Sequence, residues 1–339
     1  MKILIIGGTG NISTPTTRIL VERGHDVTLY NRGSKRIEGT KYIVGDRGKY
    51  TSFEKQMQEA GEFDCVIDMI VYDPEDVRSA VRVFRGRVGQ YLFCSTCDVY
   101  TKPSNQYPIK EDFERKPDPA FSYAFKKAAC EFILEEAYAR GDFPVTIIRP
   151  AATYQDAWTP ISLLGPGTTL MRRIRQGRPV IVMGDGTSFW VSSHRDDVGR
   201  TFAEAAGNTL TYGKAYHVTG DETMTWEEYF QTVGRVMIAP PINFVHIPAD
   251  LLGRIAPKSA EWCMLNFKFN NIFDNSAAKK DLKYRYTITW EEGVHRMVRY
   301  HDEQGEIDQS PEYPFYDRII AEYENNKSKL VEMLSPLDV

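Results

Sequence analysis

A glycine-rich run near the N-terminus constrains the fold of this chain more than any other feature. Gly7-Gly8-Thr9-Gly10-Asn11-Ile12-Ser13 directly follows a short apolar segment, Lys2–Ile6, and opens a segment with helical spacing, Ser13–Arg23. A strand that turns into a helix in this way points backbone N–H groups and the positive end of the helix at a bound anion. Gly7 permits the tight turn, and Gly10 lets a pyrophosphate approach the backbone. The run therefore predicts a dinucleotide-binding strand–turn–helix unit.

The same run departs from the usual pattern at its third glycine, where this chain has Ser13. That position serves the packing of the helix against the strand, so a small side chain is acceptable there. Asn11 and Ile12 lie in the same turn and are candidate cofactor contacts. Plain turn chemistry is the alternative for any glycine-rich turn, but the position between a strand and a helix favours dinucleotide binding.

The first half of the chain alternates short apolar runs with segments of helical spacing. The runs are rich in Val, Ile, Leu and Tyr, as buried parallel strands are, and they cover residues 2–6, 26–30, 41–44, 65–67, 90–94 and 145–148. Ser13–Arg23 and Ser122–Arg140 are each followed by a glycine, a signal for the end of a helix. This alternation predicts an α/β fold with a Rossmann-like, doubly wound parallel sheet.

The character of the sequence changes after Pro150. Residues 151–190 are rich in proline and glycine, as a loop-rich wall of a substrate cleft is, whereas Ala215–Thr219 has the pattern of another core strand. We therefore expect an NAD(P)-binding Rossmann domain over residues 1–150, to which residues 191–220 return. Residues 151–190 and 221–339 would form a smaller, partly intercalated C-terminal lobe that binds substrate and carries the last helices.

Charge and composition exclude several classes of protein. The 339 residues carry a net charge of −4, so a global basic field that would hold nucleic acid is not expected. The N-terminal apolar run is too short for a secretory signal, and no apolar stretch reaches membrane-spanning length. These features predict a cytoplasmic protein with a small-molecule substrate. The Cys94–Cys97 pair lacks a second cysteine pair or a nearby histidine, which favours buried thiols and no metal site.

A tyrosine and a lysine in the segment 122–140 carry the strongest chemical signal. Tyr123 and Lys127 are four residues apart and share one face of the expected helix. A tyrosine has a pKa of about 10, so proton transfer near neutral pH requires a nearby cation that stabilises the phenolate. Lys127 would supply that cation, and the hydroxyl of Thr96, at the end of a neighbouring strand, would orient a substrate oxygen. A surface contact is the alternative for any Tyr-x-x-x-Lys pair.

The end of the second expected strand bears on the choice between NAD and NADP. An acidic residue there would hold the ribose hydroxyls, but this chain has Asn31 and Arg32. Arg32, helped by Ser34 or Arg36, can bind a 2′-phosphate, which favours NADP. A solvated basic loop is the alternative, and Asn31 can hydrogen-bond a ribose without any phosphate. Asp46, after the third strand, is a candidate adenine contact, with a loop-capping aspartate as the alternative.

Taken together, these motifs resemble the short-chain dehydrogenase/reductase superfamily, and within it the extended or atypical branch of NAD(P)-dependent epimerase/dehydratase proteins. The resemblance also includes Val99-Tyr100, Arg149-Pro150, Gly184-Asp185-Gly186, His194 to Val198 and Phe273 to Ser276. It implies that Thr96, Tyr123 and Lys127 form the catalytic triad. It also implies that the cofactor is held at Gly7, Gly10, Ile12, Arg32 and Asp46, with Lys127 on its ribose, and that the protein forms a homodimer through a helix pair that includes Ser122–Arg140.

Two departures from the family concern the reaction and the substrate. Dehydratase relatives have acidic residues after the catalytic threonine, and here these positions are Cys97 and Asp98. Asp98 can act as an acid or base, with a turn-capping aspartate as an equal alternative. Trp190 stands where nucleotide-sugar enzymes of the family have an arginine. Either Arg172, Arg173 or Arg175 then supplies the phosphate contact, or the substrate is not a nucleotide sugar. Trp190 can stack on a sugar or base, with a buried packing tryptophan as the more common alternative.

The sequence thus predicts an NAD(P)-dependent oxidoreductase of the epimerase/dehydratase type that acts on a sugar or nucleotide-sugar hydroxyl through a keto intermediate. A simple NADPH-dependent ketoreductase is the nearest alternative. A non-catalytic NAD(P)-binding sensor or RNA-associated protein is a second alternative. The presence of Thr96, Tyr123 and Lys127 argues against a sensor, and the net negative charge argues against RNA association.

Overall fold

The computed structural model describes residues 1–335, which divide into two compact units. The first unit comprises Met1–Gln155, Val191–Glu222 and Ile272–Thr289, and the second comprises Asp156–Trp190, Thr223–Asn271 and the residues from Trp290 onward. Whether the domains expected from the sequence fold independently stays a prediction. The compact units differ from those limits mainly in residues 272–289, which cluster with the first unit.

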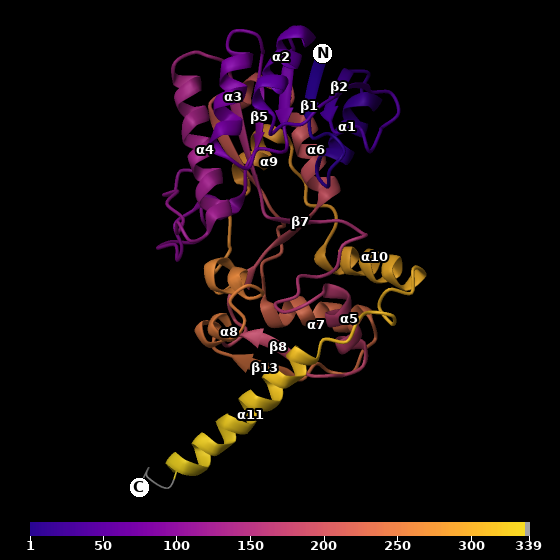
Figure 1. The fold of residues 1–339 in the computed structure, drawn as a ribbon, viewed down its shortest axis with the longest axis vertical. Helices are drawn as coiled ribbons and strands as arrows, with labels where there is room; N and C mark the ends of the chain where they lie inside the picture. The colour runs from indigo at the N-terminus through magenta and orange to yellow at the C-terminus, as the bar shows by residue number, and fades with distance from the viewer. Residues whose placement is uncertain (336–339) are drawn as a thin grey trace. The chain divides into compact units, whose positions relative to one another are not determined.

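A seven-stranded parallel sheet forms the centre of the first unit (Figure 1). Its strand order is β11-β6-β5-β4-β1-β2-β3, which confirms the predicted Rossmann-like, doubly wound fold. The expected strands agree with the observed ones to within one or two residues at each end. The strands are β1 (Lys2–Ile6), β2 (Asp26–Asn31), β3 (Lys41–Val44), β4 (Cys65–Asp68), β5 (Tyr91–Cys94), β6 (Val145–Pro150) and β11 (Lys214–Val218).

Two hydrophobic cores cover the two faces of this sheet because successive side chains of a strand point to opposite sides. Leu4 and Ile6 of β1 belong to one core, and Ile3 and Ile5 belong to the other. The first core includes side chains of α2 (Tyr50–Ala60), α3 (Pro74–Phe84) and α4 (Ser122–Ala139), and the second includes side chains of α1 (Ser13–Glu22), α6 (Arg195–Ala205) and α9 (Ser276–Leu282). A strand pair, β7 (Ala152–Tyr154) with β10 (Ser192–His194), and the short helices η1 (Cys97–Val99) and η2 (Thr209–Thr211) complete the unit.

The order of the strands reverses between β1 and β4, which are hydrogen-bonded neighbours. Connections from these strands run to opposite faces of the sheet, so a crevice opens beyond their carboxyl ends, where open α/β sheets bind ligands. The glycine-rich run follows β1 at this edge. Thr96 and η1 follow β5 at the same edge, so the topology places the two predicted motifs on one side of the sheet.

The second unit contains helices and two short strand pairs around an aromatic cluster. Trp190 stacks on Trp226 at 5.0 Å, and Tyr229 stacks on Trp290 at 4.1 Å between ring centres. The strand pairs are β8 (Val180–Met183) with β13 (Phe244–Ile247) and β9 (Phe189–Trp190) with β12 (Met224–Thr225). The helices are α5 (Gly167–Arg175), α7 (Trp226–Val236), α8 (Ala249–Ile255), η3 (Cys263–Phe267), α10 (Trp290–Glu303) and α11 (Pro314–Leu334).

Within residues 1–335, no helix combines the length and the apolar character that crossing a membrane requires.

Candidate functional site

The glycine-rich turn is fixed by the serine that replaces the third glycine. The Ser13 hydroxyl accepts a hydrogen bond from the backbone N–H of Gly10 at 2.7 Å and donates one to the carbonyl of Gly7 at 2.6 Å. Gly7 has a φ of +84°, and a Cβ atom there would lie 2.5 Å from Ile70, which follows β4. Gly7 is therefore required by both backbone conformation and close packing. Ser13 holds the turn together by hydrogen bonds, a role that the sequence pattern alone did not indicate.

Two asparagines beside this turn keep buried polar atoms without a protein partner. The Asn11 amide nitrogen donates to the carbonyl of Thr153 at 2.9 Å, but its Oδ1 atom is buried with no hydrogen-bond partner among the described residues. Asn31, at the end of β2, accepts a hydrogen bond from Gly33 at 2.8 Å, while its Nδ2 atom is buried without a partner. Unsatisfied buried polar atoms cost about 1–3 kcal/mol each, so they mark positions for a polar ligand. The turn, Asn11 and Asn31 fit a dinucleotide.

The loops after β2 and β3 carry the other candidate cofactor residues. Arg32 is exposed, whereas Arg36 lies over the ring of Tyr42 at 4.9 Å from its centre. Asp46 is also exposed, and its carboxylate accepts a hydrogen bond from the backbone N–H of Gly48 at 3.0 Å. Asp46 thus caps its own loop, and its role as an adenine contact stays a prediction.

Thr96 and Tyr123 are hydrogen-bonded to each other. Thr96 lies just beyond the carboxyl end of β5 and caps η1, with its hydroxyl 3.0 Å from a carboxylate oxygen of Asp98 and 3.2 Å from the Asp98 backbone nitrogen. Tyr123 is in the first turn of α4. The structure therefore brings Thr96, Asp98 and Tyr123 together, and their role in proton transfer stays a prediction.

Lys127 is one turn further along α4, on the same face as Tyr123. Its side chain is buried, its ammonium group donates to the carbonyl of Cys94 at 2.7 Å, and it lies 5.1 and 5.0 Å from the ring centres of Tyr72 and Phe93. Burial lowers the pKa of Lys127 from its ordinary value. The helix thus presents a buried cation to the carboxyl end of β5.

The environment of the phenol favours its protonated form. Burial raises the pKa of Tyr123 well above its ordinary value, and the negative charge of Asp98 acts in the same direction. The hydrogen bond between Tyr123 and Thr96 opposes this shift. Because the protein alone does not lower this pKa, use of Tyr123 as a base requires additional positive charge or hydrogen bonds near the phenol when ligands are bound.

Lys102 belongs to this cluster, and the sequence analysis did not identify it. Its ammonium nitrogen lies 3.6 Å from Asp98, and the side chains of Lys102 and Asp98 are 6% and 15% exposed. Burial lowers the pKa of Lys102, although the charge of Asp98 opposes that shift. The only sequence feature that relates the two residues is their separation, since Lys102 follows Asp98 by four residues. Without the structure, nothing indicated that the intervening loop folds back on the carboxylate.

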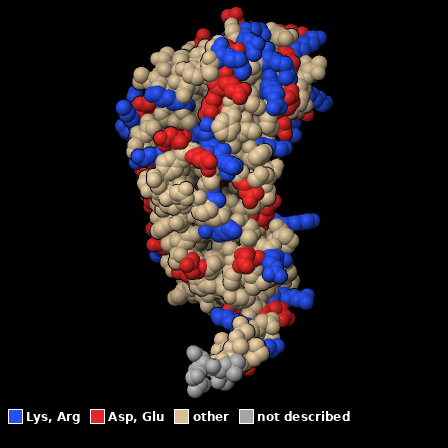
Figure 2. Space-filling view, turned by 90° about the vertical axis from the view of Figure 1, so that its left-hand side faces the viewer, with Lys and Arg blue, Asp and Glu red and all other residues tan. Residues whose placement is uncertain are grey.

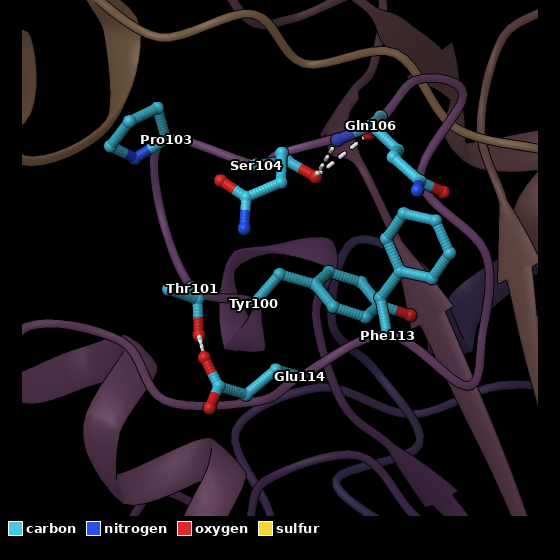
Figure 3. A pocket seen from close by; sticks show the side chains of 8 residues that line it. Tyr100, Thr101, Pro103, Ser104, Gln106, Phe113 and Glu114 are labelled. Atoms are coloured by element: carbon cyan, nitrogen blue, oxygen red, sulfur yellow. Dashed lines mark hydrogen bonds between the residues drawn. The ribbon is translucent and has the colours of Figure 1, made fainter.

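The loop that contains Lys102 also lines a pocket of about 250 Å³ (Figure 3). On one side Thr101 donates to Glu114 at 2.7 Å, and on the other Ser104 donates to the carbonyl of Gln106 at 2.8 Å. Its other lining residues are Tyr100, Pro103, Asn105 and Phe113. The residues that line this pocket begin at Tyr100, two residues after Asp98 in the chain.

The predicted substrate residues Trp190, Arg172 and Arg173 lie in the second unit. Trp190 is 4% exposed and packs between aromatic rings. Arg172 forms an ion pair with Glu312, and Arg173 is buried, with an ion pair to Asp317 at 2.8 Å. These contacts give the three residues structural roles. Their contact with substrate stays a prediction, and phosphate binding by either arginine would compete with its present ion pair.

The two cysteines of the CxxC motif are buried thiols, as expected. Burial raises the pKa of Cys94 to about 11, and the Cys97 thiol donates to the carbonyl of Arg149 at 3.1 Å. A raised pKa disfavours the reactive thiolate, which indicates a packing role. Among the described residues, no group of three or more His, Cys, Asp or Glu side chains is arranged to hold a metal ion.

Comparisons with known proteins agree with this geometry. The family model described as the NAD dependent epimerase/dehydratase family matches residues 3–218. The chain is 24% identical over 277 residues to the 2′-dehydrokanamycin reductase of Streptomyces kanamyceticus, with 81% of this chain and 77% of the relative covered. It is 27% identical over 261 residues to the chloroplast stem-loop binding protein of 41 kDa b of Arabidopsis thaliana, with 72% of this chain and 65% of that protein covered.

Solved structures share the fold at low sequence identity. The UDP-glucose 4-epimerase of Thermotoga maritima, determined with UDP-glucose, superimposes with a TM-score of 0.71 and 19% identity, over 90% of this chain and 99% of that one. The seven-stranded parallel sheet and the match over residues 3–218 lead to the same assignment. The chain belongs to the NAD-dependent epimerase/dehydratase family, and it is an NAD(P)-dependent enzyme.

Proposed function

We propose that this enzyme oxidises a sugar-like hydroxyl to a ketone, or reduces the corresponding ketone, at a site formed by Thr96, Tyr123 and Lys127. The observation that carries the proposal is the hydrogen bond between Thr96 and Tyr123 beside the carboxyl end of β5, with buried Lys127 one helical turn away. These groups lie at the sheet edge where the glycine-rich turn provides a dinucleotide cradle.

In the proposed reaction Thr96 binds the substrate oxygen through its hydroxyl group, and Tyr123 removes the hydroxyl proton. A bound nicotinamide supplies the hydride acceptor for oxidation and the hydride donor for reduction. The substrate carbon loses its hydride as the oxygen loses its proton, so the C–OH group becomes a C=O group. Lys127, one helical turn from Tyr123, would supply a buried positive charge and a donor for the cofactor ribose. The reverse proton transfer from Tyr123 regenerates the alcohol.

The keto intermediate has two fates within this family, epimerisation and elimination of water. Return of hydride to the opposite face gives the epimer, whereas elimination requires an additional acid or base. Asp98 is the candidate for that group because its carboxylate lies 3.0 Å from the Thr96 hydroxyl. Cys97 occupies the position of the second carboxylate of dehydratases, which favours epimerisation or reduction over dehydration.

We propose NADP as the preferred cofactor. Arg32 is exposed immediately after β2, where the 2′-position of the adenosine ribose is bound in doubly wound folds. A guanidinium group matches the charge and geometry of a phosphate. Asn31 has a buried amide nitrogen without a partner, and this donor fits a ribose oxygen with either cofactor.

A sugar-like substrate is supported by the names of the similar proteins, one a reductase of a dehydrokanamycin and one a UDP-glucose epimerase. Trp190, Arg172 and Arg173 stay the predicted substrate contacts. Of these, Trp190 is the strongest candidate because its indole nitrogen is buried without a hydrogen-bond partner among the described residues.

The deciding experiment combines native mass spectrometry with a Tyr123→Phe variant. Purified enzyme that retains a dinucleotide and acts without added cofactor supports the epimerase-type reaction, because that reaction regenerates its cofactor in each cycle. We expect Tyr123→Phe to lose about 10²–10⁴-fold in turnover and to bind the dinucleotide with unchanged affinity. The matched control is Tyr138→Phe, which should keep full activity. Tyr138 is on the same helix, and its side chain is 41% exposed. Equal activity of the two variants would contradict the mechanism.

The 2′-dehydrokanamycin reductase similarity favours a simple ketoreductase as the second candidate. If this chain is a simple ketoreductase, it needs one NADPH for each substrate molecule and releases the oxidised cofactor in each turnover. The similarity to a stem-loop binding protein raises RNA association as a non-catalytic alternative. The face of the molecule in Figure 2 argues against it, since basic and acidic side chains intermingle there and the chain has a net charge of −4. Binding of a stem-loop RNA that persists at physiological salt would support that alternative.

A further inference from the structure

A continuous apolar stripe runs along the C-terminal helix α11. Phe315, Ile319, Tyr323, Leu330 and Leu334 are spaced by four, four, seven and four residues, so they share one face of the helix. Asn326 fills the remaining position of the stripe near its middle. A stripe of this length is typical of a helix that packs against other elements along its whole length.

The first half of the stripe borders a groove, and within it Ile319 is buried while Phe315 is 40% exposed. Phe315, Ile319 and Tyr323 line a groove of about 490 Å³ together with Leu251 and Ile255 of α8, and Arg318, Glu322 and Asn326 form the rest of its lining. Ile319 is 5% exposed, whereas Leu330, Met333 and Leu334 are 52%, 64% and 47% exposed. Figure 1 shows the C-terminal half of α11 extending past α8. One helix therefore carries both an apolar groove and an uncovered apolar end.

We infer that α11 binds α11 of a second copy of this chain in antiparallel orientation. In that arrangement Leu334 lies opposite the partner's Phe315, and Leu330 lies opposite the partner's Ile319. Both pairs are centred between Glu324 and Asn325, so a single two-fold axis satisfies them together. The uncovered end of each helix then enters the partner's groove, which makes the surface self-complementary, as an isologous dimer interface must be.

The charges beside the stripe favour this orientation. Glu322 and Lys329 are seven residues apart, so they lie on the same edge of the apolar face. Antiparallel pairing places Glu322 near the partner's Lys329, and two-fold symmetry produces this pair twice. In a parallel pair the two copies of this edge lie on opposite sides of the interface, so Glu322 and Lys329 would not meet. The charge pattern thus complements a second copy of the same helix. For this reason we infer that the groove binds another copy of this chain.

This interface is separate from α4, where the family resemblance implies a dimer, and it does not depend on the proposed reaction. Two self-associating surfaces on one chain would give assemblies larger than a dimer.

Sedimentation equilibrium of the full chain tests the surface. We expect Leu330→Asp to weaken self-association by at least about tenfold, because it places a charge in the partner's groove. Leu210→Asp is the matched control, since Leu210 is 65% exposed in the first unit. Glu322→Lys should also weaken association, and Glu322→Lys combined with Lys329→Glu should restore it. A wild-type monomer, or association unchanged by Leu330→Asp, would overturn the inference.

Cross-linking tests the orientation independently. A short bis-maleimide should link Asn326→Cys chains to each other because this position lies near the proposed axis. The native cysteines are buried and contribute little background. It should not link Ser335→Cys chains, whose cysteines would be about 30 Å apart in the antiparallel pair at 1.5 Å per residue. Links at both positions would indicate parallel helices, and links at neither would show that the helices do not pair. Either result would overturn the proposal.

Discussion

The ammonium nitrogen of Lys102 lies 3.6 Å from the carboxylate of Asp98, and the protein excludes most solvent from both side chains. Asp98 also accepts the hydrogen bond of Thr96, whose hydroxyl is bonded to Tyr123. A polar chain therefore connects the candidate catalytic tyrosine to a lysine on the neighbouring loop. Lys102 acts on the site through Asp98, so we regard it as a positioning residue.

The first prediction concerns the energy of this pair. We expect a double-mutant cycle with Lys102→Met and Asp98→Asn to give a coupling energy of about 1.5–3 kcal/mol in urea denaturation, because removal of one partner leaves a buried charge uncompensated. The exposed pair Lys41–Asp26, at 2.7 Å, is the control and should give less than about 1 kcal/mol. Similar couplings for the two pairs would argue against a special role for Lys102.

A second measurement links the pair to the reaction. The pH profile of turnover should change in Lys102→Met and should be restored in Lys102→Arg.

The second prediction concerns the serine in the glycine-rich turn. Ser13→Ala removes two partly buried hydrogen bonds and should lower the free energy of unfolding by about 1–3 kcal/mol, and it should weaken dinucleotide binding. Thr14→Ala removes a hydrogen bond to the Gly10 carbonyl on the exposed side, so its effect should stay within about 0.5 kcal/mol. Thermal unfolding and cofactor titration measure both effects. If Ser13→Ala were as mild as Thr14→Ala, the hydroxyl would not hold the turn.

The third prediction concerns Arg32 and the cofactor phosphate. Arg32→Ala should raise the dissociation constant of NADPH by about tenfold or more and leave that of NADH unchanged, since only NADPH carries the 2′-phosphate. Lys35→Ala, in the same exposed loop, is the matched control. Fluorescence titration of the reduced nicotinamide gives both constants. Equal weakening of NADPH and NADH by Arg32→Ala would remove the basis for an NADP preference.

The fourth prediction concerns the pH dependence of stability. Burial lowers the pKa of Lys127 in the folded protein, so between that value and the pKa of free lysine, about 10.4, the unfolded chain binds more protons. The contribution of Lys127 to stability therefore improves as the pH rises through this interval. Lys127→Met lacks the buried charge, so its free energy of unfolding should exceed the wild-type value at pH 7.

Urea denaturation at a series of pH values measures this difference, which should narrow toward alkaline pH. The matched control is Lys126→Met, which removes an exposed lysine paired with Asp73 at 3.0 Å and should show no comparable trend. A Lys127→Met protein that is less stable than wild type at every pH would show that the Cys94 hydrogen bond and the ring contacts outweigh the cost of burying the charge.

The sequence predicted the sheet well because most of its strands are buried on both faces. Segments such as Lys2–Ile6 and Tyr91–Cys94 are short and mostly apolar, and the glycines after the helices mark the helix ends. The position of Thr96 after β5 and the spacing of Tyr123 and Lys127 also followed from local pattern. Periodicity and turn chemistry determine such features within a few neighbouring residues, so no tertiary information was needed.

The remaining features depend on contacts between distant residues. Ser13 is only a small residue in the sequence, and folding of the turn decides that its hydroxyl joins Gly7 to Gly10. The arginines of α5 could have faced a phosphate, but Asp317 and Glu312, more than a hundred residues away, pair with them in the structure.

The sequence by itself determined the strand–turn–helix unit and the parallel sheet, and it placed Thr96 after a strand and Tyr123 and Lys127 on one helix. Only the tertiary structure decided that Lys102 contacts Asp98, because a loop's return path is set by packing and not by its own pattern. It likewise decided that the first half of the apolar stripe on α11 faces α8 across a groove and that the second half does not. Local propensity specifies an element and its apolar face, whereas the partner of that face is chosen by the competing free energies of the whole chain.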